Sequence, residues 1–155
     1  MRFSGRRIVV LVLLVSTLFV GSAAAASSAG AATTFRPTAS EVRMGWLINR
    51  AREHANRWGL KYSPALSKIA RAHSALMASE GTIFHTTNLA NSFRNFSWTI
   101  GGENVGMGPS MYALHTAFML SPHHRENNLD KRFHRFGIGV VWKNGIAFVT
   151  VQFLS

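Results

Sequence analysis

Histidines are the most prominent residues that could do chemistry, and several of them fall near an acidic residue in irregular parts of the chain. The chain has seven histidines but only six aspartates and glutamates in total. Segments without a long hydrophobic period contain four such residues: His85, Glu103, His123 and His124. Neutral imidazoles and carboxylates bind zinc, and they also act as general acids and bases. These residue types therefore indicate either a cation site or acid–base chemistry.

No local motif decides between these chemistries. The chain lacks a His-Glu-x-x-His pair, a G-x-S-x-G elbow and a glycine-rich loop followed by Lys-Ser or Lys-Thr. Its lack of cysteine excludes a disulfide scaffold, a Cys-ligated zinc site and thiol catalysis. On spacing alone, solvated loop histidines are the favoured interpretation.

The first residues of the chain have the order of a secretory signal peptide. Three arginines precede the uncharged apolar run 8–20, and an alanine-rich tract follows it. As a helix this run would reach about 20 Å, short of the roughly 30 Å hydrocarbon core, which favours a cleaved signal over a membrane anchor. Cleavage after Ala25 satisfies the Ala-x-Ala rule. We therefore predict a signal peptide over 1–25 and a flexible lead over 26–36.

Positive charge remains after this segment is removed. The whole chain carries a formal charge of +11, from 17 basic and 6 acidic residues. Three of the arginines belong to the predicted signal, so 17 − 3 = 14 basic residues face 6 acidic ones, or +8 on residues 26–155. Most of this charge is interpreted as solvated surface. An acidic lipid or an anionic envelope polymer remains a candidate partner, whereas export argues against nucleic acid.

Helical patterns occupy the first half of the remaining chain. The capping box Thr38-x-x-Glu41 predicts the start of a helix whose apolar positions run to Trp58, and Gly59 is expected to end it. A serine cap and a proline at the first helical position predict a second helix over 63–81. One histidine, His73, lies on its apolar stripe and is interpreted as a hydrogen-bonded core residue.

The second half mixes loops, one helix and a hairpin. Residues 81–108 are predicted to be loops with a short strand or turn near 103–107, and a helix over 110–120 is expected to stop at the next Ser-Pro pair. Two β-rich runs, 136–142 and 146–153, flank an Asn-Gly turn signal.

This order of elements predicts a single α+β domain over 37–155. Helices grouped against a small antiparallel sheet are the arrangement that such an order favours. The sequence gives no indication of an oligomeric state.

Four separated segments carry motifs that are weak singly and specific together. They are Asn49-Arg50 with Gly59-Leu60 and 63–66, then 70–74 with Phe84-His85, then Gly102-Glu103-Asn104-Val105, and finally 121–133 running into 136–140. In this order they resemble the CAP superfamily, the cysteine-rich secretory, antigen-5 and pathogenesis-related-like proteins. The resemblance covers roughly residues 42–153 and is to the bacterial, cysteine-free branch, the SCP-like extracellular domains.

The resemblance implies a three-layer α-β-α sandwich with a central cavity where two histidines and acidic side chains can hold zinc or another divalent cation. Matched by motif, the ligand-binding and metal-binding residues are His85, Glu103 and His124. His123 stands where the family usually has glycine. The family's second acid has no counterpart in residues 113–120, so metal binding is expected to be weak. Four further motif positions are interpreted as structural: Asn104, Arg125, Asn127 and Asp130.

The resemblance favours a secreted, non-enzymatic module of the cell envelope or medium. Such a module would bind a ligand or partner, with lipid, sterol and anionic envelope polymer as the candidate classes. The alternative is a metal-dependent hydrolase or peptidase in which Glu103 is the general base. No catalytic nucleophile is recognisable, and the fold does not specify the substrate.

Overall fold

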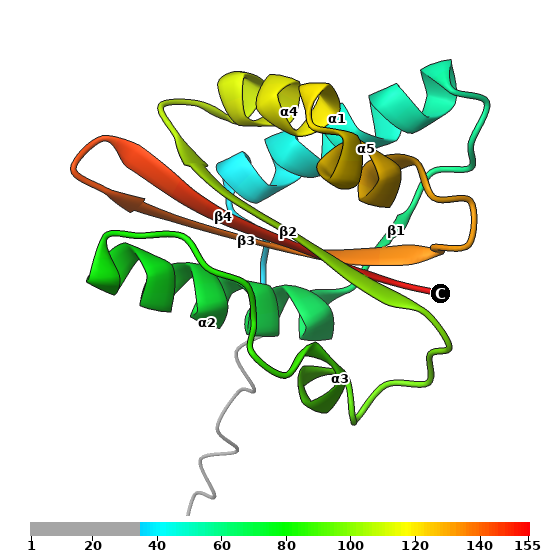
Figure 1. Ribbon diagram of the computed structural model, residues 1–155, viewed down its shortest axis with the longest axis horizontal. Helices are drawn as coiled ribbons and strands as arrows, with labels where there is room; N and C mark the ends of the chain where they lie inside the picture. Colours follow the sequence, from blue (N-terminus) through cyan, green and yellow to red (C-terminus); the bar gives the residue numbers. More distant parts are fainter. Residues whose placement is uncertain (1–34) are drawn as a thin grey trace, which may run out of the picture. The chain divides into compact units, whose positions relative to one another are not determined.

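The protein, described here by a computed structural model over residues 35–155, is an α-β-α sandwich (Figure 1). The predicted signal peptide and most of the predicted lead lie outside the described residues. One helical layer contains α1 (Ala39–His54), α4 (Met111–Leu120) and α5 (Pro122–Leu129), and the opposite layer contains α2 (Pro64–Glu80) and α3 (Leu89–Ser92). The predicted α+β class and three-layer architecture are confirmed.

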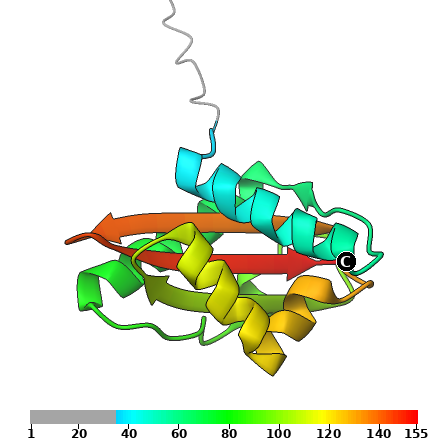
Figure 2. The ribbon, with the colours of Figure 1, turned by 90° about the horizontal axis from the view of Figure 1, so that it is seen from above.

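The sheet between these layers has four strands in the order β1-β3-β4-β2. They are β1 (Lys61–Tyr62), β2 (Gly101–Gly108), β3 (Arg135–Lys143) and β4 (Ile146–Leu154). Both β2 and β3 pair with β4 in antiparallel fashion, and β1 adds a two-residue parallel edge to β3. Figure 2 shows α1 and α4 lying side by side across one face of this sheet.

The hairpin and the helix starts follow the local signals of the sequence. Asn144 and Gly145 both have positive φ, 50° and 76°, as a two-residue hairpin turn requires. The Thr38 capping box begins α1, and Gly81 ends α2 in the left-handed conformation.

The first helix ends earlier than predicted. It stops at His54, and Asn56 adopts a left-handed φ of 53° that turns the chain away from the helix axis. Trp58, expected on the apolar stripe, is therefore outside the helix and 92% exposed. Its placement in the core was wrong because the stripe was extended past the residue that breaks the helix.

Other differences lie in the segments interpreted as loops. The Ser-Pro pair ends α4 as predicted, but Pro122 then occupies the first turn of a new helix, α5. The strand expected near 103–107 is longer, spanning the whole of β2. Within residues 35–155, no helix is both long and apolar enough to cross a membrane.

Helix α2 packs so closely against β3 that its backbone leaves no room for a side chain at two glycines of that strand. A Cβ at Gly137 would come within 2.4 Å of the Leu66 carbonyl carbon, and one at Gly139 within 2.2 Å of that of Ala70. Buried Ser74 donates a hydrogen bond to the carbonyl of Gly139, at 3.0 Å. These contacts fix α2, and with it the loop that carries His85.

Candidate functional site

The centre of the site is the carboxylate of Glu103, a buried residue of β2. It lies opposite Gln152 of β4 in the sheet register. One oxygen, Oε1, is 3.0 Å from His85 Nδ1 and accepts the Thr86 amide at 2.9 Å. The other, Oε2, accepts the Thr86 hydroxyl at 2.7 Å and the Gln152 amide at 3.1 Å. Four protein groups therefore surround this carboxylate.

These contacts determine the charge state of Glu103. Burial alone would raise its pKa, but hydrogen bonds from Thr86, Gln152 and His85 together lower the pKa below its ordinary value. Glu103 is therefore an anion at neutral pH, and both of its oxygens are occupied.

His85 is oriented by Glu103 but faces solvent. Its side chain is 63% exposed, whereas that of Glu103 is 3% exposed. Hydrogen bonding of Nδ1 to the carboxylate favours the tautomer with the proton on Nδ1, which leaves Nε2 free to act as an acceptor. A carboxylate that orients an imidazole in this way is a common arrangement behind ligand-binding histidines.

His124 lies on α5, in the helical layer that also contains α1 and α4. Its ring packs against Phe118, with ring centroids 5.0 Å apart. Burial lowers the pKa of His124, and the nearby His85 and His123 lower it further, so the ring is neutral at pH 7. His124 therefore lies near enough to His85 for His85 to lower its pKa. Of the three predicted residues, only His85 and Glu103 are joined by a direct hydrogen bond.

A metal would find few ligands at this site. Across residues 35–155, no three His, Cys, Asp or Glu side chains are grouped so that they could hold a metal ion. Glu103 has no oxygen free, so the two imidazoles, His85 and His124, are the donors that remain. Zinc sites in proteins use three or four protein ligands.

The sequence of the chain also matches a known protein family. The profile of CAP, the cysteine-rich secretory protein family, matches residues 47–153. The chain belongs to this family. It does so without a single cysteine. A comparison with curated proteins gives no significant match.

Several solved structures share the fold of this chain. An extracellular protein with an SCP domain from Bacillus anthracis is 23% identical, with a TM-score of 0.67; the match covers 74% of this chain and 40% of that one. An outer surface protein of Borrelia burgdorferi is 18% identical, with a TM-score of 0.69 and coverages of 77% and 96%. A structure of NaASP2 with Zn²⁺ is 11% identical, with a TM-score of 0.59 and coverages of 78% and 82%. The chain thus spans two fifths of the Bacillus protein.

An amide network holds helix α5 of this CAP domain against the site. Asn104 donates to the His124 carbonyl at 2.9 Å and to the Asn128 side chain at 3.1 Å. Asn127 donates to the Glu103 carbonyl at 3.2 Å and to the Asn104 side chain at 2.9 Å. These bonds attach α5 to β2 and agree with the structural interpretation of Asn104 and Asn127.

The other two motif positions differ from each other. Asp130 pairs with Arg132, with 2.6 Å between Oδ2 and Nη2, and its carbonyl accepts a hydrogen bond from Arg52. Arg125, in contrast, is exposed and lines a groove between α1 and the α4–α5 pair. The structural role expected for Arg125 is therefore not supported by a contact of its side chain.

Sequence reasoning missed two residues that hold Glu103. Thr86 supplies two of its hydrogen bonds, and Gln152 supplies a third from a strand that is otherwise almost entirely apolar. The isolated amide of Gln152 in the run 146–153 was the available signal, because a buried amide requires partners.

A further histidine, His73 on α2, is partly buried against the sheet. Its Nδ1 is 3.1 Å from the Thr150 hydroxyl, as the interpretation of a hydrogen-bonded core histidine requires. Burial lowers the pKa of His73, which keeps the ring neutral. Its Nε2 and the Gln152 Oε1 are both buried without a protein hydrogen-bond partner in the described part of the chain.

Proposed function

We propose that this CAP protein is an exported, non-enzymatic binding module whose polar site is formed by His85, Glu103 and His124. The observation that carries this proposal is the pairing of an exposed imidazole with a buried carboxylate that has no free oxygen. Such a pair fixes one histidine tautomer and presents its Nε2 to a ligand.

The same geometry argues against the alternative of a hydrolase or peptidase. A general base needs an accessible lone pair and works best with a pKa near the working pH. Glu103 has the opposite properties: its pKa is lowered and its oxygens accept bonds from His85, Thr86 and Gln152. Glu103 is therefore better suited to orienting His85 than to removing a proton from water.

A weakly held divalent cation is the ligand that can be tested most directly, although two imidazoles are fewer donors than a usual zinc site has. His85 and His124 would hold it, and Glu103 would act through His85 instead of touching the ion. A bound cation would supply a Lewis-acidic point for an anionic or carbonyl group of a further ligand. With two protein donors we expect the affinity to be low, and the Zn²⁺ in the NaASP2 structure supports testing zinc first.

The place of action that we propose is outside the cell. The order of charged, apolar and small residues at the start of the chain supports export. Two proteins that share the fold are an extracellular protein of Bacillus anthracis and an outer surface protein of Borrelia burgdorferi, which also supports this location. Release into the medium and attachment to the envelope are both compatible with these observations.

Calorimetry with zinc chloride on the purified protein tests the binding role. We expect His85→Ala and His124→Ala each to abolish uptake, while His134→Ala, which removes an exposed histidine, leaves it unchanged. Glu103→Gln should weaken binding about tenfold, the lower end of what loss of an orienting partner costs. Equal uptake by the protein and by His85→Ala would contradict the assignment.

The non-enzymatic part needs a separate test. A broad panel of peptides and esters is incubated with the protein and with Glu103→Gln, with and without zinc. We expect no turnover that differs between the two proteins. Hydrolysis that depends on Glu103 would favour the hydrolase alternative.

A further inference from the structure

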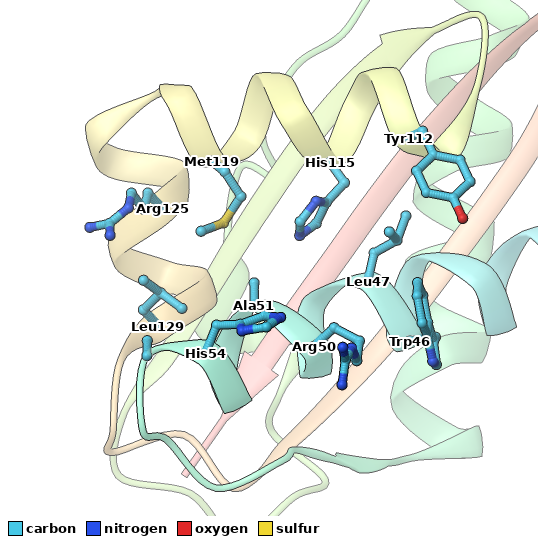
Figure 3. Close-up of a pocket in the computed structure, with 11 residues that line it drawn as sticks. Trp46, Leu47, Arg50, Ala51, His54, Tyr112, His115, Met119, Arg125 and Leu129 are labelled. Atoms are coloured by element: carbon cyan, nitrogen blue, oxygen red, sulfur yellow. The ribbon is translucent and has the colours of Figure 1, made fainter.

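A second candidate site lies away from the His85–Glu103 pair, in a groove between α1 and the α4–α5 pair (Figure 3). Its volume is about 620 Å³, within the range usual for ligand pockets. Its apolar surface comes from Leu47 and Ala51 on α1, Met119 on α4 and Leu129 on α5. The groove is therefore formed where helices far apart in sequence lie side by side, and it does not depend on the function proposed above.

Two aromatic rings form one end of this groove. Trp46 of α1 and Tyr112 of α4 are 50% and 55% exposed. The Arg43 guanidinium lies 5.8 Å from the Trp46 ring centroid and 5.6 Å from that of Tyr112, and it donates a hydrogen bond to the Tyr112 hydroxyl at 3.2 Å. Cation–π contacts of this kind hold aromatic side chains in place. The rings thus offer fixed and partly uncovered faces.

The groove is lined by two arginines, Arg50 and Arg125, and two histidines, His54 and His115. No aspartate or glutamate lines it. The Arg50 guanidinium also lies 5.9 Å from the Trp46 ring centroid, while it pairs with Glu53 outside the groove. Arg125 stands at the opposite end from Trp46 (Figure 3), and its guanidinium has no hydrogen bond or ion pair within residues 35–155.

A polar atom inside the groove also lacks a partner. His115 Nε2 is buried and makes no hydrogen bond to any described residue, and Figure 3 shows the ring pointing from α4 toward α1. Burial lowers the pKa of His115, so the ring is neutral at pH 7. Buried ring nitrogens are normally hydrogen-bonded. The ring lines the groove, so a small rotation of it would bring this nitrogen within reach of a hydroxyl group bound there.

We propose that the groove binds a segment of an anionic polymer made of phosphate-linked polyol or sugar units. Guanidinium groups such as those of Arg50 and Arg125 pair well with phosphate. The aromatic faces at Trp46 and Tyr112 suit the C–H surface of a polyol or sugar, and His115 suits a hydroxyl. A neutral ligand would leave the basic side chains unused.

The half-exposed rims favour a polymer over a single acyl chain. A small apolar ligand is bound tightly when most of its surface is buried, whereas the Trp46 and Tyr112 rings leave this groove open. A polymer can pass through an open groove and gain affinity from several weak repeats. An anionic lipid surface is the competing partner, and the experiment distinguishes the two.

The probe is a synthetic glycerol phosphate oligomer, titrated into the purified protein by calorimetry at low salt. Arg125→Gln and Trp46→Ala should each weaken binding about tenfold, as loss of a charge-assisted bond or an aromatic contact does. Two matched controls lie outside the groove: Arg94→Gln, an exposed arginine next to α3, and Trp58→Ala, an exposed tryptophan. Neither control should change the affinity more than about twofold, because neither side chain lines the groove.

Further measurements keep the result interpretable. Trp46→Phe retains an aromatic face and should recover most of the binding, which separates loss of the contact from a folding defect. Equal losses for Arg125→Gln and Arg94→Gln would overturn the proposal, because they would indicate attraction by overall charge alone. Trp46-dependent binding to phosphatidylglycerol vesicles, without binding to the oligomer, would overturn it in favour of a membrane surface.

Discussion

The carboxylate of Glu103 has a defined consequence for the stability of the protein in acid. Its pKa in the folded state is below the ordinary value of 4.5 because the hydrogen bonds from Thr86, Gln152 and His85 outweigh burial. The unfolded chain therefore takes up the proton at a higher pH than the folded protein does. Stability from this group is present above pH 4.5 and is lost as the pH falls through the lower, folded-state pKa.

Glu103→Gln tests this linkage. The variant should be less stable than the natural protein by about 1–2 kcal/mol at pH 7, because a neutral amide cannot accept from all the donors that surround the carboxylate. The difference should shrink as the pH falls below 4.5. Urea denaturation followed by circular dichroism between pH 7 and pH 3 measures it, and a difference that is constant with pH would contradict the ionised state of Glu103.

At the scale of single residues, the sequence predicted the pair His85–Glu103 but not what surrounds it. Motif order identified the two partners, and the structure joins them at 3.0 Å. Thr86 and Gln152 could not be assigned, because their roles arise from the register between β2 and β4 and from the course of the loop after α2. Neither of these is encoded by local spacing.

The elements divide into those with local signals and those formed by tertiary contacts. The caps of α1 and α2 and the Asn144-Gly145 turn depend on neighbours in sequence, and all were predicted. The full length of β2 was not, because its glycine-rich and asparagine-rich sequence has low strand propensity. Its glycines instead make room for side chains: a Cβ at Gly106 would lie 2.9 Å from the Phe118 ring.

Arg52 is the buried charge that connects α1 to distant elements. The residue is 1% exposed, and its guanidinium donates to the carbonyls of Trp58, Asn128 and Asp130 at 2.8, 2.8 and 3.0 Å. Burial lowers the pKa of Arg52 while Asp130 raises it. The side chain thus satisfies carbonyl groups at the end of α5 and in the loop after α1.

Arg52→Met should therefore destabilise the protein by about 3 kcal/mol, since several buried carbonyls lose their donors at once. The control is Arg57→Met, which removes an exposed arginine nearby and should cost less than about 0.5 kcal/mol. Denaturant midpoints with unchanged slopes give both values. Equal effects of the two substitutions would mean that the interior contacts of Arg52 contribute little.

At the scale of the whole molecule, the first prediction concerns export, which depends on residues outside the described structure. Leu13→Arg and Leu14→Arg together place two charges in the apolar run 8–20 and should keep the protein inside the cell, because a signal peptide needs an uncharged central region. Cell fractionation and mass measurement of the released protein provide the readout. The natural chain should be recovered outside with Ala26 as its first residue, and release of the double variant at the same level would contradict the signal peptide.

The charge that remains after export leads to the last prediction. Four of the six acidic residues are already paired, Glu41 with Arg71, Glu53 with Arg50, Glu103 with His85 and Asp130 with Arg132. Few carboxylates are left to offset the exposed lysines and arginines, so attachment to an anionic envelope should depend steeply on salt. The screening length falls from about 10 Å at 0.1 M to about 3 Å at 1 M salt. Protein retained on isolated envelopes at low salt should therefore be released in this range, whereas uncharged sucrose at equal osmolarity should release none. Attachment that persists at 1 M salt would indicate apolar contacts instead of charge as its basis.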